Sequence, residues 1–531
     1  MQGTIRKITH KKFTPLILIL FLYLALVLFR FFHQGLINVD EANSLIVAQT
    51  YATLMTTALT HPSQVSSSDF YRNLMASYGN TYTTSRPAFV ILGSIIDVLY
   101  HSEYSTRIVS VLAGAGIIIY FYRILLHFEF ERRIAFISTL MVSVSPLLIT
   151  YARTGLTHIT AGFFMLSALF YALQYQKTST KRSLILFSLS SAGALLSYYL
   201  LIPALGVMCI YGGYILIKKK APRSHALIGI FSFLFPIVVW EVITRIGVFM
   251  SETKNLGEAS KNIMPYTGEL IAQWSLSHGV QFILFDQPLY YIKLLFNTEH
   301  LIIFALFVIG ICVLIKKVRT NPYQTLIVCM VPYGIYISLI FLKFPRTLTP
   351  ILPFIYIVVA FGLRTLYTSL SRALYNLTPY RYILLITIGV MLTHGLYYKN
   401  LFTLETGIKN ITAAIKSTYN PHTTVIYTAS PAIWRAYLRE FNIQLSDKMP
   451  QQHDRHKTIV GISDWHTTIA GTSPFDAYRT NIQGVYPYTI YRLQPLMLDS
   501  YYGSKSIEDF FPTSYKKETQ ILEITLGDNE T

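Results

Sequence analysis

The sequence predicts a polytopic α-helical membrane protein, and three observations carry that prediction. First, 52% of the 531 residues are hydrophobic and only 13% are charged, which is too apolar for the surface of a soluble enzyme. Second, apolar runs of about 20 residues, the length that crosses a bilayer as a helix, recur up to about residue 397. Third, the Lys and Arg residues behind the net charge of +18 stand in small groups between these runs. They therefore indicate membrane topology and exclude a nucleic-acid-binding stripe.

Eleven transmembrane helices are predicted from this length criterion. The first run follows Arg6, Lys7, Lys11 and Lys12 but no small-residue cleavage site follows it, so we interpret it as an uncleaved first span. The fifth and sixth spans divide one long apolar run at Pro203. The predicted spans are 14–32, 104–126, 134–150, 157–175, 183–200, 202–217, 225–244, 300–315, 324–342, 347–366 and 381–397.

The short loops give the orientation, because Lys and Arg are enriched in loops that stay in the cytoplasm. Alternate loops are basic and the loops between them are sparse in charge, so we expect a cytoplasmic N-terminus and an extracytoplasmic C-terminus in the plasma membrane. The basic loops contain Arg132 and Arg133, then Lys177, Lys181 and Arg182, then Lys218, Lys219, Lys220 and Arg223, then Lys316, Lys317 and Arg319, and finally Arg372 and Arg381.

Two domains follow from this topology. Residues 1–397 form the transmembrane domain, with long outside loops at 33–103 and 245–299. In the first loop, 87–100 is apolar but too short to span, which favours an interfacial or re-entrant helix. Residues 398–531 form a small extracytoplasmic α/β domain, because β-type runs at 424–427, 458–461 and 488–491 alternate with a helix-like stretch at 432–441.

Two adjacent carboxylates, Asp40 and Glu41, come shortly after the first span. Ionisable residues at membrane depth cost free energy and are usually kept for function. The alternative is that these acids only begin an interfacial helix, where a negative charge in the first turn favours the helix dipole. The local sequence around Asp40 and Glu41 does not decide between these two interpretations.

Several cations are placed by the same topology at the outer membrane face: Arg86, Arg107, Arg153, Lys343 and Arg346, together with His158. Carboxylates facing cations at one depth suit a group transfer from a lipid-linked phosphate. One carboxylate takes a proton from the acceptor hydroxyl, and the cations stabilise the departing phosphate. The alternative for each cation taken singly is that its head group snorkels to the interface at the end of a span.

The order of these motifs resembles glycosyltransferase family 39. This family belongs to the GT-C superfamily and contains the protein O-mannosyltransferases and the transferase that adds aminoarabinose to lipid A. The resemblance covers about residues 14–397. It rests on Asp40-Glu41 after the first span, Arg86-Pro87 before an apolar helix, Ser105-Thr106-Arg107 opening a span, Ser145-Pro146 through Ala152-Arg153, and Lys343-Phe344-Pro345-Arg346 followed by Pro350 and Pro353.

The resemblance implies a GT-C-like fold and an inverting transfer of a sugar from a polyprenyl-phosphate donor. By motif, Asp40 is the expected base and Glu41 its neighbour, paired with a cation such as Arg107. The donor phosphate is expected to contact Arg153 and Arg346, with Arg107 and Lys343 as further candidates. One departure concerns His158, since protein O-mannosyltransferases have Asp five residues after the Arg that ends the third span. The expected acceptor is therefore a protein, lipid or glycan hydroxyl, without a decision among them.

Other residues carry weaker signals. Arg86, His158, Trp274 and Tyr290 are substrate-side candidates. Trp274 and Tyr290, together with Tyr291, are chosen because a sugar or lipid can stack on an aromatic ring. A patch of His453, Asp454, His456, Asp464 and His466 in the tail fits either a solvated loop or a metal site. No cofactor is required by the sequence, and a divalent metal stays open.

The rival function is a transporter or flippase of lipid-linked sugar, whose cations would bind phosphate without chemistry. Such carriers usually show internal repeats and interrupted helices near the bilayer midplane, whereas the polar residues here gather at the outer face. The sequence has no P-loop, which leaves ATP-driven transport without support. The expected partners are a polyprenyl-phosphate-linked sugar, the acceptor and membrane lipids, and no nucleic acid.

Overall fold

The computed structural model describes residues 2–36, 39–65, 86–253, 266–268, 270–271, 289–339, 344–373, 379–402, 407–446, 457–464, 475, 478–487 and 518–525. Lys343, Trp274 and the predicted strand at 488–491 lie outside these ranges. Of the predicted tail patch, only Asp464 lies within them.

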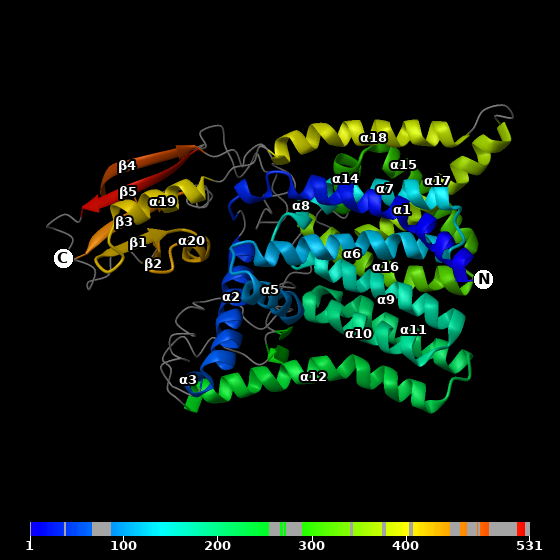
Figure 1. Cartoon of the computed structure of the whole chain (residues 1–531), viewed down its shortest axis with the longest axis horizontal. Helices are drawn as coiled ribbons and strands as arrows, with labels where there is room; N and C mark the ends of the chain where they lie inside the picture. Colours follow the sequence, from blue (N-terminus) through cyan, green and yellow to red (C-terminus); the bar gives the residue numbers. More distant parts are fainter. Residues whose placement is uncertain are drawn as a thin grey trace.

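A body of long helices and a smaller sheet domain form the described structure (Figure 1). The long helices run nearly side by side, and the sheet domain sits at one end of them. The helices of this body are α1 (Gln2–Leu28), α6 (Ser105–His127), α7 (Arg132–Ser143), the short α8 (Pro146–Ala152), α9 (His158–Thr178), α10 (Lys181–Ser197), α11 (Ile202–Lys218), α12 (Arg223–Thr253), α15 (Leu301–Lys317), α16 (Asn321–Leu339), α17 (Leu352–Ala373) and α18 (Pro379–Phe402).

Every predicted span overlaps a helix, although one of them is broken. The predicted third span is the pair α7 and α8, which meet at a bend of 54°. The bend lies at Ser145-Pro146: Ser145 caps α8 by accepting from the Leu148 N–H at 3.2 Å, and Pro146 occupies its first turn. By length and composition, five of the described helices can cross a membrane alone, or six if the bent pair counts as one span.

Small residues allow helices α15 and α17 to pack closely. A side chain at Gly310 would collide with the Val358 carbonyl, and one at Gly362 would collide with the Leu306 carbonyl. Because neither glycine has a Cβ, the two backbones touch directly. Close backbone approach through small residues is the usual way in which membrane helices associate when no hydrophobic driving force separates them from lipid.

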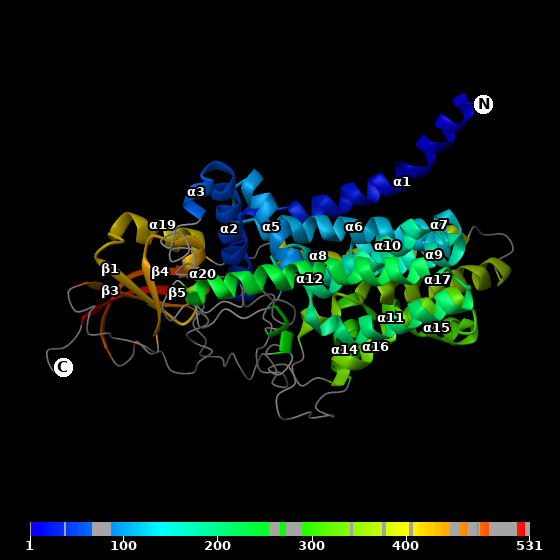
Figure 2. The same cartoon turned by 90° about the horizontal axis from the view of Figure 1, so that it is seen from below.

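Helices α2 (Val39–Thr60) and α5 (Pro87–Leu99) lie at the end of the helical body that faces the sheet domain. Helix α2 runs across the direction of the long helices in both views (Figure 2), and α5 packs against it. Leu92, Ile95 and Leu99 on α5 are exposed. This is the geometry expected of the interfacial alternative for 87–100, with an apolar face available to the membrane surface.

The sheet domain begins after α18. The predicted boundary lies at 397/398; α18 continues to Phe402, and α19 (Ile408–Thr418) is the first helix after it. Its five strands are arranged in the order β2-β1-β3-β5-β4. Strands β1 (Thr424–Thr428), β2 (Asn442–Leu445) and β3 (Thr458–Ser463) are parallel, and β5 (Glu518–Thr525) runs antiparallel to both β3 and β4 (Arg479–Pro487).

Two of the sheet's strands match the predicted runs, and three were missed. Buried β1 and β3 show a continuous apolar pattern and were predicted. Strand β4 was missed because its described side chains are mostly exposed and its register shifts between Ile482 and Gly484, which breaks the alternation of apolar and polar residues. Helix α20 (Pro431–Tyr437) ends earlier than the helix predicted at 432–441.

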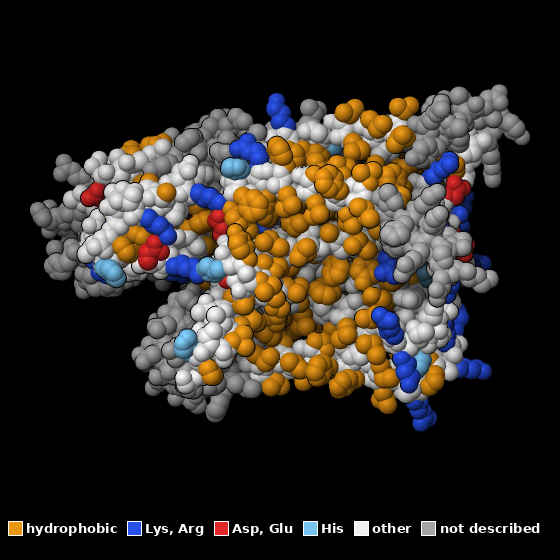
Figure 3. Space-filling model, in the orientation of Figure 1, with side chains coloured by type: hydrophobic (Ala, Val, Ile, Leu, Met, Phe, Trp, Pro, Cys, Tyr) orange, Lys and Arg blue, Asp and Glu red, His pale blue; other side chains and the backbone are white. Residues whose placement is uncertain are grey.

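The surface of the helical body separates apolar from basic regions. Hydrophobic side chains cover its middle, and Lys and Arg gather at the end away from the sheet domain (Figure 3). Arg132, Lys177, Arg182, Lys218 and Lys316 at the ends of the long helices are exposed. A wide apolar band bounded by such a basic end is the surface of an integral membrane protein.

This surface predicts that the basic end faces the cytoplasm and the sheet domain faces outward. In a variant without the three native cysteines, a membrane-impermeant thiol reagent should label Ser417→Cys, an exposed site in the sheet domain, in intact cells. Thr320→Cys, an exposed site at the basic end, should react only after the membrane is made permeable. Labelling in the reverse order would contradict the predicted orientation.

Candidate functional site

The predicted carboxylate pair lies in the first turn of α2. Helix α1 ends at Leu28, a short 3-10 turn η1 (Phe31–His33) follows, and α2 starts at Val39. Both acids therefore lie at the positive end of the α2 dipole, as the interfacial interpretation expects. The two side chains nevertheless have different surroundings, which the dipole alone does not explain.

Glu41 is fully buried and forms an ion pair with Arg107. Its Oε1 accepts from Arg107 Nε at 2.5 Å and from the Gly155 N–H at 2.7 Å. A side chain at Gly155 would collide with the Thr106 hydroxyl and crowd Glu41, so the close approach requires glycine there. The predicted pairing of Glu41 with Arg107 is confirmed.

Arg107 uses its whole guanidinium group inside the protein. Besides Glu41, it donates from Nη1 to the Gln34 carbonyl at 2.7 Å and from Nη2 to the Gly35 carbonyl at 2.8 Å. Its side chain is 1% exposed. This geometry does not support the predicted contact of Arg107 with a donor phosphate, because Nε and both Nη atoms are occupied. Arg107 instead ties the segment before α2 to α6.

Arg153 also points into the protein. It is buried, and its Nη1 donates to the carbonyls of Val27 at 2.6 Å and Phe29 at 2.7 Å. These carbonyls lie in the last turn of α1 and just after it, where a cation satisfies unpaired acceptors and faces the negative end of the dipole. The predicted phosphate contact of Arg153 is not supported by this geometry. The residue caps α1 and fixes where the chain turns towards α2.

Asp40 differs from Glu41 because it is partly open to solvent, with 21% of its side chain exposed. Its Oδ2 lies 3.0 Å from Arg346 Nη2 and 3.9 Å from Arg86 Nη2. Burial raises the pKa of Asp40, but the charges of Arg346 and Arg86 outweigh it and hold the pKa below its ordinary value. The carboxylate is therefore ionised at neutral pH and flanked by two guanidinium groups.

Arg346 is positioned by the turn η4 (Pro345–Leu348), which neighbouring tyrosines secure. Tyr333 on α16 donates to the Thr347 carbonyl at 2.8 Å, and the Tyr291 hydroxyl bonds the Thr347 hydroxyl. The Arg346 guanidinium also lies 4.7 Å from the ring centroid of Phe344. Among the cations predicted for the donor phosphate, Arg346 is the described one that reaches Asp40.

His158 begins α9 and is 1% exposed. Both ring nitrogens lack a hydrogen-bond partner among the described residues, which is costly for a buried polar group. Its ring packs on Tyr198 at 4.5 Å between centroids, and the charges of Arg346 and Arg86 act on it. His158, which is predicted to face the substrate, therefore has two ring nitrogens without a described partner, close to Arg346 and Arg86.

Of the predicted aromatic residues, Tyr290 is partly buried and contacts the Tyr291 ring at 5.0 Å between centroids, and Tyr291 bonds Thr347 beside Arg346. Tyr198 and Tyr333 were not predicted. Their positions in apolar runs resemble ordinary interface tyrosines, so the sequence contained no signal to separate them. Trp274 and Lys343 lie outside the described residues.

A second buried acid, Glu299 at the end of α14 (Tyr290–Glu299), was missed by the sequence analysis. Its Oε1 accepts from the Ser145 hydroxyl at 2.7 Å and its Oε2 from the Tyr356 hydroxyl at 2.5 Å. The Leu147 N–H adds a bond at 3.2 Å. Glu299 therefore holds the break between α7 and α8 against α17. A lone acid just before an apolar run was the available signal.

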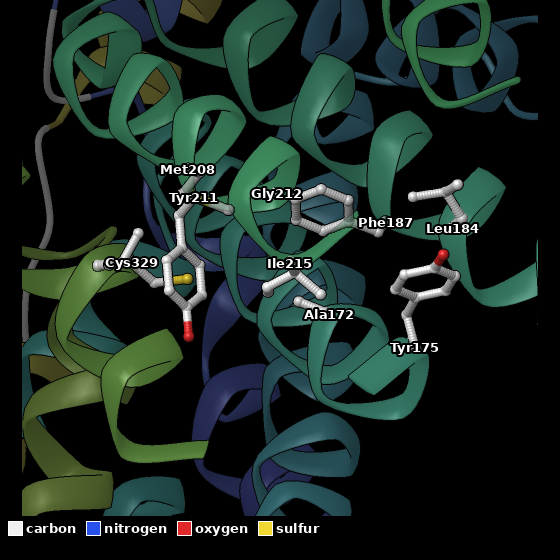
Figure 4. A pocket seen from close by; sticks show the side chains of 10 residues that line it. Ala172, Tyr175, Leu184, Phe187, Met208, Tyr211, Gly212, Ile215 and Cys329 are labelled. Carbon is white, nitrogen blue, oxygen red and sulfur yellow. The ribbon is translucent and has the colours of Figure 1, made fainter. Parts of the chain in front are cut away.

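A separate cavity lies at the opposite end of the body, between α9, α10, α11 and α16 (Figure 4). It is lined mainly by apolar side chains such as Phe187, Met208 and Ile215 and has a volume of about 20 Å³, room for about one water molecule. None of the residues around Asp40 lines it. In the part of the chain that is described, no three His, Cys, Asp or Glu residues gather into a possible metal site. A requirement for a divalent metal ion therefore stays a possibility raised by the sequence.

Comparison with known proteins agrees with this architecture. The family model of dolichyl-phosphate-mannose-protein mannosyltransferases (PMT) matches residues 66–246. Two crystal structures of ArnT from Cupriavidus metallidurans are similar over 96% of this chain and 97% of theirs, at 12% sequence identity. The TM-score is 0.60 for the structure bound to undecaprenyl phosphate and 0.61 for the apo structure. No curated protein matches the sequence.

These findings confirm the predicted fold class and the predicted resemblance. The chain is a polytopic membrane protein with the GT-C fold of ArnT and a small C-terminal sheet domain, and it resembles glycosyltransferase family 39. At 12% identity the structural likeness establishes the fold alone.

Loss of one member of the Glu41–Arg107 pair should destabilise the protein. Glu41→Gln leaves a buried guanidinium without its carboxylate, which typically costs about 3–5 kcal/mol. Glu299→Gln is the matched control, because that equally buried acid is bound by hydroxyls and an N–H. Thermal unfolding in detergent should therefore show a larger loss for Glu41→Gln than for Glu299→Gln. Equal losses would contradict the structural importance of the ion pair.

Proposed function

We propose that this protein is a membrane glycosyltransferase that moves a sugar from a polyprenyl-phosphate donor to an acceptor hydroxyl at the outer face, with Asp40 as general base. The single observation that carries the proposal is the position of Asp40. It is a partly exposed, ionised carboxylate held between Arg346 and Arg86 at the end of the helical body that bears the sheet domain.

The donor class is supported by what the similar proteins bind. The matching family model describes enzymes that use dolichyl-phosphate mannose, and one of the similar ArnT structures contains undecaprenyl phosphate. Both ligands are polyprenyl phosphates. The proposal extends this donor class to the present chain and includes hexose or pentose sugars and protein, lipid or glycan acceptors.

The geometry supports a single inverting displacement. Asp40 removes the proton from the acceptor hydroxyl as its oxygen attacks the anomeric carbon of the sugar. The bond between that carbon and the phosphate oxygen breaks, and polyprenyl phosphate departs with the electron pair. Arg346 and Arg86, which flank the carboxylate, are suited to stabilise the negative charge that grows on the phosphate. Their fork of N–H donors fits phosphate oxygens in pairs.

The remaining residues of the site have supporting roles. The Glu41–Arg107 pair and the Arg153 cap fix the segment that leads into α2, and so set where Asp40 lies. His158 is assigned to the sugar side. Its free ring nitrogens can donate to and accept from sugar hydroxyls, and its neighbour Tyr198 supplies an aromatic face.

A carrier of lipid-linked sugar is the less favoured alternative. It would explain cations that bind phosphate. The Asp40 carboxylate, 3.0 Å from Arg346, would however repel a bound phosphate and would have no function in a carrier. In a transferase the same carboxylate has a task. A carrier is also expected to place its site near the bilayer midplane, whereas Asp40 lies on a helix that runs across the end of the spans.

Asp40→Asn should lower the turnover number by at least about 100-fold, because general-base assistance is worth typically 10²–10⁴-fold. Donor binding should persist, since Asn keeps the shape and removes a charge that repels phosphate. Because Arg346 and Arg86 hold the pKa of Asp40 low, the parent enzyme should lose activity only as the pH falls below the ordinary Asp range. The measurement is transfer of radiolabelled sugar by purified protein, with donor affinity measured alongside. Near-parental transfer by Asp40→Asn would refute the base assignment.

Arg346→Lys should weaken use of the donor while preserving the charge, because lysine lacks the planar fork that binds two phosphate oxygens. An increase of about tenfold in the donor KM is expected, which corresponds to about 1.4 kcal/mol. The matched control is Arg364→Lys, since Arg364 also packs on an aromatic ring, 5.1 Å from the Phe130 centroid, on α17. Donor titrations that show the same KM for both variants would remove Arg346 from the phosphate site.

A further inference from the structure

The sheet domain contacts residues 31–36, the segment that leads into Asp40 and Glu41. Lys409 on α19 pairs with Glu103 at 2.5 Å, just before α6 begins. The same ammonium donates to the Phe32 carbonyl at 2.9 Å and lies 4.8 Å from the centroid of the Tyr104 ring. Tyr104 in turn donates to the Phe32 carbonyl at 2.7 Å. One lysine of the sheet domain thus joins the turn after α1 to the start of α6.

A second contact reaches further along the segment. The Tyr437 hydroxyl at the end of α20 accepts from the Leu36 N–H at 3.1 Å. Tyr437 also lies close enough to Glu103 to act electrostatically on the carboxylate that pairs with Lys409. Leu36 is four residues before Asp40 and three before α2 begins.

The two parts also share one hydrophobic core. Leu36, Ala42 and Leu45 are buried in the same cluster as residues of the sheet domain, and α2 packs on α20. The sheet-domain members of this cluster are Ile408, Ile411, Ile415, Ile426, Ile433, Trp434, Leu438, Phe441, Ile443, Val460, Ile462 and Ile521. A domain tethered only by a linker would meet its neighbour through a more polar surface. The core of this domain instead continues into the first turns of α2.

The same segment is also held by the membrane body. Arg107 on α6 binds the carbonyls of Gln34 and Gly35, between the two residues that the sheet domain contacts. The segment 31–36 is therefore bound by both the sheet domain and the membrane body. Because Asp40 follows within one turn of α2, any shift of this segment changes its distance from Arg346.

We propose that the C-terminal sheet domain is a positioning device for Asp40, in which Lys409 and Tyr437 fix the segment 31–36 and α20 supports the first turns of α2. The proposal rests on the proposed function of Asp40 and adds a role for the domain. Lys409 and Tyr437 are positioning residues, since they touch the segment and not the reacting atoms. The sheet domain is thus part of the active site without contributing a catalytic group.

The test compares Lys409→Met and Tyr437→Phe with Lys416→Met in the full chain. Lys416 is the matched control, because it lies on the same helix and forms a similar ion pair with Glu440 at 2.8 Å, but within the sheet domain. The first two variants should lower kcat for sugar transfer between about tenfold and a hundredfold, the range expected when a reacting group is misplaced. The donor KM should stay unchanged, and Lys409→Arg should recover most of the activity.

Hydrogen exchange provides a readout that does not depend on activity. In Tyr437→Phe the Leu36 N–H loses its acceptor, so peptides covering residues 31–45 should exchange faster than in the parent and in Lys416→Met. Faster exchange together with the loss of kcat supports the proposal. Unchanged exchange and unchanged kcat in both variants would overturn it, as would equal effects of Lys416→Met. If the parent protein transfers no sugar, the proposed function fails, and the exchange data still decide whether the domain holds the segment.

Discussion

The buried ion pair between Glu41 and Arg107 is the interaction on which the arrangement of the site depends. A guanidinium and a carboxylate without exposure to water are stable only if their remaining hydrogen-bonding groups are also satisfied. Here the chain satisfies them with the Gly155 N–H and the carbonyls of Gln34 and Gly35. This requirement brings α6, the end of α8 and the segment before α2 to one place.

Two adjacent acids thereby acquire different properties. Neighbouring residues on a helix point in directions about 100° apart, so Glu41 faces the interior and Asp40 faces Arg346 and Arg86. The inner acid neutralises a structural cation, and the outer acid keeps solvent contact and a lowered pKa. The difference that makes one of them suitable as a base comes from burial and partners and is absent from the residue types.

The arginines, like the two acids, differ in their partners. Of the four cations predicted for the donor phosphate, Arg107 and Arg153 bind backbone carbonyls inside the protein, and Arg346 reaches Asp40. Arginine serves both purposes because its donors fit carbonyls of a helix end as well as phosphate oxygens. A cation at a membrane interface is therefore not evidence of ligand binding until its donors have been accounted for.

The sequence alone determined the membrane class and the helical body, because these depend on local properties, and it predicted the candidate site. Each apolar run became a helix, since backbone groups in lipid must bond within the segment, and the order of Asp40, Arg86, Arg107, Arg153 and Arg346 already indicated the fold. Tertiary structure decided which cations face Asp40, the bend at Ser145-Pro146, the buried Glu299 and the contact of the sheet domain with residues 31–36. These features arise from partners far apart in the chain, and hydropathy and spacing contain no information about which distant residues meet.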